Sequence, residues 1–164
     1  MQYNTKRSVL EFGRFLVERT TALSWIEERI AESRRLEESD RLVSQHAMSV
    51  FDNLWDEIKK LIEEAKKHNF QIFTNGSPEN REIRLSTDPT PTQHSSPGRE
   101  FHLSISKDRK TISVAGPPVS IVFTVGVCPD GVVCLRSDGE PISIQKAAER
   151  IFDRLLFPHL PPRS

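Results

Sequence analysis

The two cysteines, Cys128 and Cys134, are the side chains whose spacing could support redox or metal chemistry. They flank a turn of Pro129, Asp130 and Gly131, and the loop length decides whether the sulfurs can meet. A two-residue turn places the two side chains on opposite faces of a hairpin, whereas an odd-length loop places both on one face. No nearby C-x-x-C or H-x-x-x-H motif completes a zinc site. We therefore expect free, buried and unreactive thiols, with a redox pair or a metal clip as the alternative.

The five histidines, at positions 46, 68, 94, 102 and 159, lie on different predicted elements and show no helical i, i+4 pair. Nucleophilic catalysis needs a serine or cysteine held beside a base and an orienting group, and no G-x-S-x-G motif provides this arrangement. The seven glycines form no phosphate-binding loop. The sequence therefore favours a protein without catalytic residues, cofactor or metal.

Opposite charges are balanced, with 23 lysine and arginine residues against 23 aspartate and glutamate residues. A chain without net charge creates no long-range field that attracts nucleic acid. Its basic clusters, Arg34-Arg35 and the lysines at positions 59, 60, 66 and 67, are interleaved with glutamates. This pattern predicts a salt-bridged solvent face, and it argues against nucleic acid as a partner.

Apolar residues recur at helical spacing in the first part of the chain, over residues 9–30 and again over residues 43–65. Residues 33–40 interrupt the pattern, and Ser39 or Asp40 could cap a second helix. We predict a helical hairpin over residues 1–69, with one continuous helix as the alternative. The wider apolar stripe of the second helix predicts that it also touches a sheet.

Alternating apolar residues follow, and they predict six strands joined by short turns in an antiparallel meander. The predicted strands are Phe70–Thr74, Glu82–Ser86, Glu100–Ser106, Thr111–Ala115, Val119–Val127 and Val132–Arg136. The proline-rich segment Thr87–Gly98 is expected to be a mobile surface loop.

A C-terminal helix is predicted over Ile144–Phe157, capped by Ser143, stopped by Pro158 and packed on the sheet, with residues 158–164 as a tail. Together these elements predict one α+β domain covering residues 1–164.

Two surfaces are candidates for binding. The polar side of the sheet carries His102, Ser104, Ser120 and Thr124, which could form a ligand or partner face, although an ordinary solvated sheet face is favoured. On the first helix Leu10, Val17 and Trp25 lie off the main apolar stripe. They could contact another helix, as in a symmetric dimer, or be covered by the chain's own termini.

The leading hypothesis is a non-enzymatic protein interaction or adaptor module that associates through its N-terminal helices. The alternative is a small-ligand binding domain or weak hydrolase, with a cleft between the second helix and the sheet and His102 as acid or base. Nucleic-acid binding is the third hypothesis. The sequence shows no secretory signal, and its longest apolar run, residues 119–127, is too short to span a bilayer. With two cysteines expected as free thiols, we expect a cytoplasmic protein with no membrane partner.

Overall fold

The computed structural model describes residues 6–86, 98–117 and 119–161, with the side chains of the first helix described from residue 24 onward. The chain divides after Asp40 into two units, of which the second contains the sheet. The prediction that residues 1–164 form one domain stays a prediction. Of the predicted mobile loop Thr87–Gly98, only Gly98 falls within the described residues. No helix of the described residues is long and apolar enough to cross a membrane.

The first element, α1, is a single helix from Lys6 to Lys67, so the predicted hairpin is wrong. Residues 33–40 contain neither glycine nor proline, and their arginines, leucine and glutamates are good helix formers. The Ser33 hydroxyl also donates a hydrogen bond to Glu37, one turn later, at 3.4 Å. The interrupted apolar pattern therefore marks a polar stretch of one helix, and Ser39 and Asp40 lie inside that helix rather than at the start of a second one.

The end of α1 lies where its sequence predicts it. Lys66 and Lys67 occupy the last turn, where positive charge suits the helix dipole. Asn69 adopts a left-handed conformation with φ of 66°. The amide of Phe70 then donates to the carbonyl of Ala65 at 3.3 Å, which closes the helix end.

The sheet is an antiparallel meander in which every strand pairs with its neighbours in sequence. The meander is confirmed, but the described residues form a sheet of seven strands rather than the predicted six. The strands are β1 (Gln71–Ser77), β2 (Asn80–Ser86), β3 (Arg99–Ile105), β4 (Thr111–Gly116), β5 (Val119–Val127), β6 (Val133–Ser137) and β7 (Glu140–Ile142). The additional strand is β7. Asp138 and Gly139, with φ of 55° and 87°, form the turn that leads into it.

The second helix, α2 (Ile144–Leu156), begins as predicted, because the Ser143 hydroxyl accepts the amide of Lys146 at 3.1 Å. Its C-terminal end is hydrogen-bonded to a side chain of the sheet. The guanidinium of Arg99 on β3 donates to the carbonyls of Leu155 and Leu156 at 2.9 and 3.2 Å. These are carbonyls that a helix C-terminus leaves without an intrahelical partner.

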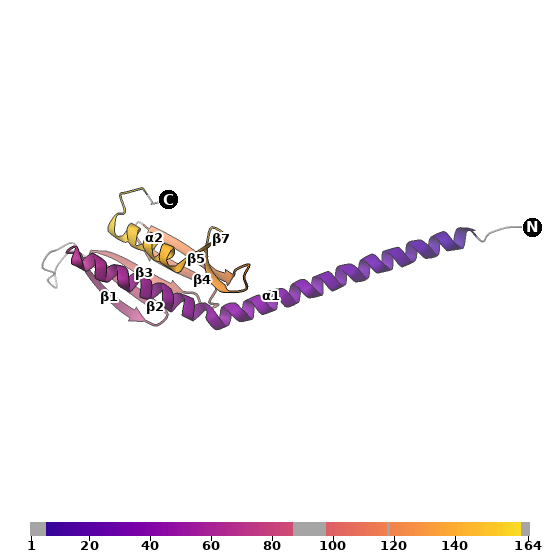
Figure 1. Ribbon diagram of the computed structural model, residues 1–164, viewed down its shortest axis with the longest axis horizontal. Helices are drawn as coiled ribbons and strands as arrows, with labels where there is room; N and C mark the ends of the chain where they lie inside the picture. The colour runs from indigo at the N-terminus through magenta and orange to yellow at the C-terminus, as the bar shows by residue number, and fades with distance from the viewer. Residues whose placement is uncertain (1–5, 87–97, 118, 162–164) are drawn as a thin grey trace, which may run out of the picture. The chain divides into compact units, whose positions relative to one another are not determined.

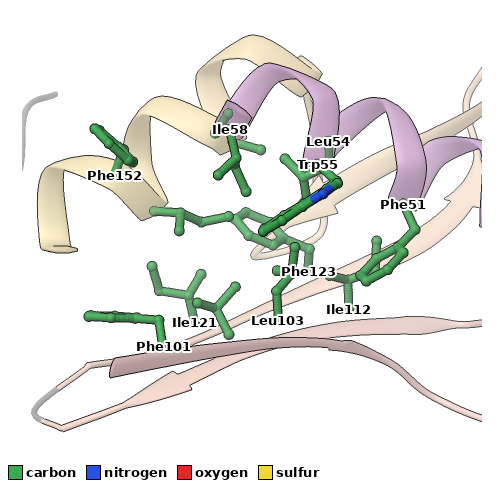
Figure 2. Packing of buried hydrophobic residues seen from close by; sticks show 14 of the residues in the cluster. Phe51, Leu54, Trp55, Ile58, Phe101, Leu103, Ile112, Ile121, Phe123 and Phe152 are labelled. Atoms are coloured by element: carbon green, nitrogen blue, oxygen red, sulfur yellow. The ribbon is translucent and has the colours of Figure 1, made fainter. Parts of the chain in front are cut away.

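One face of the sheet is covered by helices. In Figure 1 the C-terminal part of α1 and the whole of α2 lie over the same face of the meander. Between the layers, apolar side chains from both helices meet the inward residues of the strands, as Figure 2 shows for α1 and α2 above β3, β4 and β5. The largest of these with less than 2% exposure are Phe51, Phe101 and Phe123. The core is therefore a single layer between helices and sheet.

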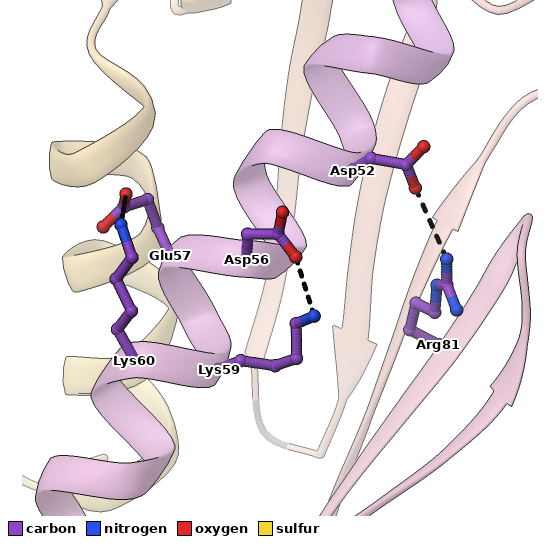
Figure 3. Close-up of polar contacts among 6 residues, drawn as sticks. All are labelled: Asp52, Asp56, Glu57, Lys59, Lys60 and Arg81. Carbon is purple, nitrogen blue, oxygen red and sulfur yellow. Dashed lines mark hydrogen bonds and ion pairs between the residues drawn. The ribbon is translucent and has the colours of Figure 1, made fainter.

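A polar contact joins α1 to β2 at one side of this core. The Arg81 guanidinium lies 5.7 Å from the centre of the Trp55 ring, and it reaches the Asp52 carboxylate at 3.4 Å (Figure 3). Arg81 thus makes a cation–π contact and an ion pair with the same helix.

Replacing Phe123 by alanine tests the position of the core. Phe123 is fully buried, and we expect Phe123→Ala to lower the free energy of unfolding by about 3–5 kcal/mol in chemical denaturation. Val122→Ala is the matched control, since the adjacent Val122 is 54% exposed on the opposite face. Equal losses from the two substitutions would contradict this one-sided core.

Candidate functional site

Cys128 and Cys134 form a disulfide, so the expectation of free thiols is wrong. Their Cα atoms lie 6.0 Å apart. The amide of Cys128 donates to the carbonyl of Val132 at 2.8 Å, which leaves residues 129–131 as the loop. This loop has an odd number of residues, and both cysteines therefore lie on one face of the sheet, as the alternative reading of the spacing required.

The disulfide changes the argument about location and metal binding. Disulfides persist mainly in oxidising compartments, so the cysteines no longer support the predicted cytoplasmic location. Among the described residues, no group of three or more histidine, cysteine, aspartate and glutamate side chains could hold a metal ion.

The predicted ligand face lies on the side of the sheet that the helices leave uncovered. His102 and Ser120 share one row across the strands, because Ala115 pairs with both. Ser104 pairs with Ser113 in a second row, and Thr124 pairs with Arg136 in a third. The four residues share a face but do not converge on one point, and their role in binding stays a prediction.

Charged residues that the sequence analysis missed surround His102. Arg84 contacts Glu82 at 2.8 Å and Glu100 at 3.1 Å, and the other oxygen of Glu100 lies 3.0 Å from Nε2 of His102. Glu82 and Arg84 lie two residues apart in one predicted strand, and so do Glu100 and His102 in the next. This spacing places both members of each pair on one face of the sheet, and it was the signal for the cluster. All four side chains are at least 23% exposed, and ion pairs this accessible to water contribute little to stability. The arrangement is a surface ion-pair network that places no nucleophile beside the imidazole.

The centre of the interface between α1 and the sheet, where a ligand cleft was predicted, is filled. Between α1 and the sheet lie the side chains of Phe51, Leu54 and Ile58, none of which is exposed (Figure 2). Closely packed interiors leave few voids larger than a water molecule. The hypothesis of a small-ligand site therefore gains no support at this position.

The outer face of α1 after residue 50 is lined by ion pairs, as the interleaved charges predict. Figure 3 shows Asp56 with Lys59, at 2.7 Å, and Glu57 with Lys60. The next turns repeat the pattern with Glu63–Lys66 and Glu64–Lys67. These four lysines are neutralised by carboxylates one turn earlier, and this disfavours a phosphate-binding role for this face.

A different surface lies earlier on α1. Trp25, Ile26, Ile30 and Leu36 are 62%, 45%, 47% and 62% exposed. Trp25 is one of the three predicted interface residues, whereas Leu10 and Val17 lie outside the residues whose side chains are described. Ile26 and Ile30 belong to the main apolar pattern predicted for residues 9–30, from which Trp25 was set apart. Without the hairpin, they join Trp25 on an exposed apolar surface.

Comparison with known proteins finds no match among protein-family models, curated proteins or solved structures.

The ion pair of Asp56 gives a test by titration. A hydrogen bond from the Lys59 ammonium, and then its charge, lower the pKa of Asp56 below its ordinary value. A lowered carboxyl pKa stabilises the fold above the pKa of the unfolded chain, and this contribution is lost as pH falls through the folded-state pKa. We expect Lys59→Met to raise the pKa of Asp56, measured by carboxyl NMR titration, and Lys60→Met to raise it less. The reverse order would contradict the pairing.

The disulfide gives a second test. It closes a short loop with a sequence separation of 6, and a loop of this length is worth about 2 kcal/mol in the chain-entropy model. A reductant should lower the free energy of unfolding of the natural chain by about this amount, and it should leave a Cys128→Ala, Cys134→Ala chain unchanged. Identical denaturation curves of the natural chain with and without reductant would exclude a stabilising disulfide.

Proposed function

We propose that this chain is a self-association module, in which the N-terminal part of α1 pairs with the same segment of a second copy. The observation that carries the proposal is the exposed apolar surface of Trp25, Ile26, Ile30 and Leu36. We call these four residues the apolar stripe. Pairing of the two helices thereby links the sheet-containing units of the two copies.

The apolar stripe has the width of a helix contact. At about 100° per residue, its four side chains span an arc of roughly 140°, which is typical of a helix face buried against another element. Burying one isoleucine completely is worth about 1.5–3 kcal/mol. Covering this face would therefore release substantial free energy, and contiguous exposed apolar surface commonly marks an interaction site.

The spacing favours another helix as the partner. Leu23, Ile26 and Ile30 are separated by three and then four residues, and Val9, Phe12 and Leu16 continue the same alternation in the sequence. A repeat of this kind, averaging 3.5 residues, leads helices to supercoil around each other.

A second copy of the chain supplies a helix with the same period and length. Arg19 and Ser33 occupy the two polar positions of this repeat in the sequence. Polar residues in a seam lower the stability of a coiled coil but select one alignment. We therefore expect a reversible dimer with a defined register, and no catalytic role for the chain.

The test is a double substitution in the full chain. Ile26→Glu with Ile30→Glu places charges in the seam, and each should weaken association by at least about tenfold, because each removes roughly 1.5–3 kcal/mol of apolar burial. Sedimentation over a concentration series measures the change.

Ser24→Glu is the matched control, because Ser24 is exposed on the other side of the same helical segment. It should leave the dissociation constant close to that of the natural chain. An unaltered mass distribution in the double variant, or an equal loss in the control, would refute the proposed contact.

A further inference from the structure

We infer that β1 is a second contact surface, at which the free edge of the sheet pairs antiparallel with β1 of another copy and Phe73 faces its counterpart. This contact is distinct from the proposed helix pairing. A chain with two independent two-fold contacts can build assemblies larger than a dimer.

The hydrogen-bond pattern shows which backbone groups of β1 point outward. The amide of Ile105 donates to the carbonyl of Glu79 at 3.2 Å, so the groups of Arg81 and Ile83 point toward β3 and not toward β1. Their partners on β1 are Gly76 and Thr74. Together with Ile72, these residues direct their N–H and C=O groups to the side of β1 on which no described strand lies.

The edge at β1 lacks the features that usually prevent strands from pairing. Its seven residues, Gln-Ile-Phe-Thr-Asn-Gly-Ser, include no charge and no proline. The opposite edge, β7, has only three residues, and they include Glu140 and Pro141. Short length, charge and proline are common protections of an edge strand. The sheet is thus protected at β7 and left open to pairing at β1.

Phe73 indicates how the strands align. The residue is 50% exposed, and it pairs with Arg84 on the uncovered face of the sheet. If Ile72 pairs with Thr74 of the other copy, the outward backbone groups of these two residues are satisfied in both strands, and the two Phe73 side chains stand opposite each other. They then occupy a non-hydrogen-bonded pair, in which antiparallel side chains approach most closely.

A second copy is favoured over a strand from another protein by the composition of β1. In this register Phe73 faces its own copy, Gln71 faces Asn75 and Ile72 faces Thr74, and like charges at such opposed positions would repel each other. In β1 this pairing opposes only amide, hydroxyl, aliphatic and aromatic groups. The strand is therefore compatible with its own copy.

The test is cysteine crosslinking in the full chain. With oxidised glutathione as the oxidant, one introduced thiolate forms a mixed disulfide, and attack by the second thiolate releases glutathione and links the two chains. Phe73→Cys places the introduced sulfurs opposite each other. Asn75→Cys is the matched control, because it is exposed on the same strand and face, but in this register its two copies are about 13 Å apart.

We expect Phe73→Cys to yield at least about tenfold more linked dimer than Asn75→Cys on non-reducing gels, since disulfide formation requires close Cβ atoms. Adding Thr74→Pro, which removes an outward amide, should abolish the link, whereas Thr74→Ala should preserve it. Equal linking of both cysteine variants, no linking of either, or a link that survives Thr74→Pro would overturn the inference.

The same comparison is made in the Ile26→Glu, Ile30→Glu chain. There the helix contact is disrupted, so a preferred link at position 73 must form through the sheet. This background separates the two contacts, because the link is expected to persist even if the helix proposal fails. Loss of the preference for position 73 in this background would also overturn the inference.

Discussion

The need to cover one apolar face of the sheet determines how the described residues after Asp40 are arranged. An antiparallel sheet can leave one face in water, but its other face must pack against something. Here the residues of α1 from Val43 to Ala65, together with α2, provide that cover. The side chains between these layers are almost fully buried. Polar contacts such as Arg99 with the end of α2, and Arg81 with Asp52, then hold the helices at the margins of the core.

This packing confines the polar chemistry of the described residues to their surface. No polar or charged residue is buried among them. Four lysines of α1 are paired along the helix, at positions 59, 60, 66 and 67, and His102 lies in an exposed network with Glu100 and Arg84. Within the described part of the chain, the apolar stripe and the backbone edge of β1 have no partner of matching chemistry. Both suit association with protein better than catalysis, and this is why we propose a role in assembly.

The parts of the fold that follow from local chemistry could be predicted. The strands around Phe101, Ile112 and Phe123 follow from alternation, and the start of α2 follows from Ser143. The bend in α1 was wrong, because a polar stretch such as residues 33–40 ends an apolar stripe without ending a helix. Strand β7 was missed, since three residues containing Pro141 show no alternation. Whether the two cysteines could form a disulfide depended on the number of residues in the loop, and the sequence Pro129-Asp130-Gly131 did not decide that number. Glu100 lies two residues before His102 on β3, so alternation alone places both on one face, whereas the contact of Glu100 with Arg84 on β2 depends on the register.

The central claim is that residues 43–65 of α1 are covered by their own chain, whereas the apolar stripe is covered only when a second copy of the chain binds. Hydrogen exchange of the full chain, followed by mass spectrometry at increasing protein concentration, tests both halves together. The account predicts slow exchange over residues 43–65 at every concentration, with protection over residues 25–36 appearing only as the concentration rises. Exchange over residues 25–36 that is independent of concentration would contradict it.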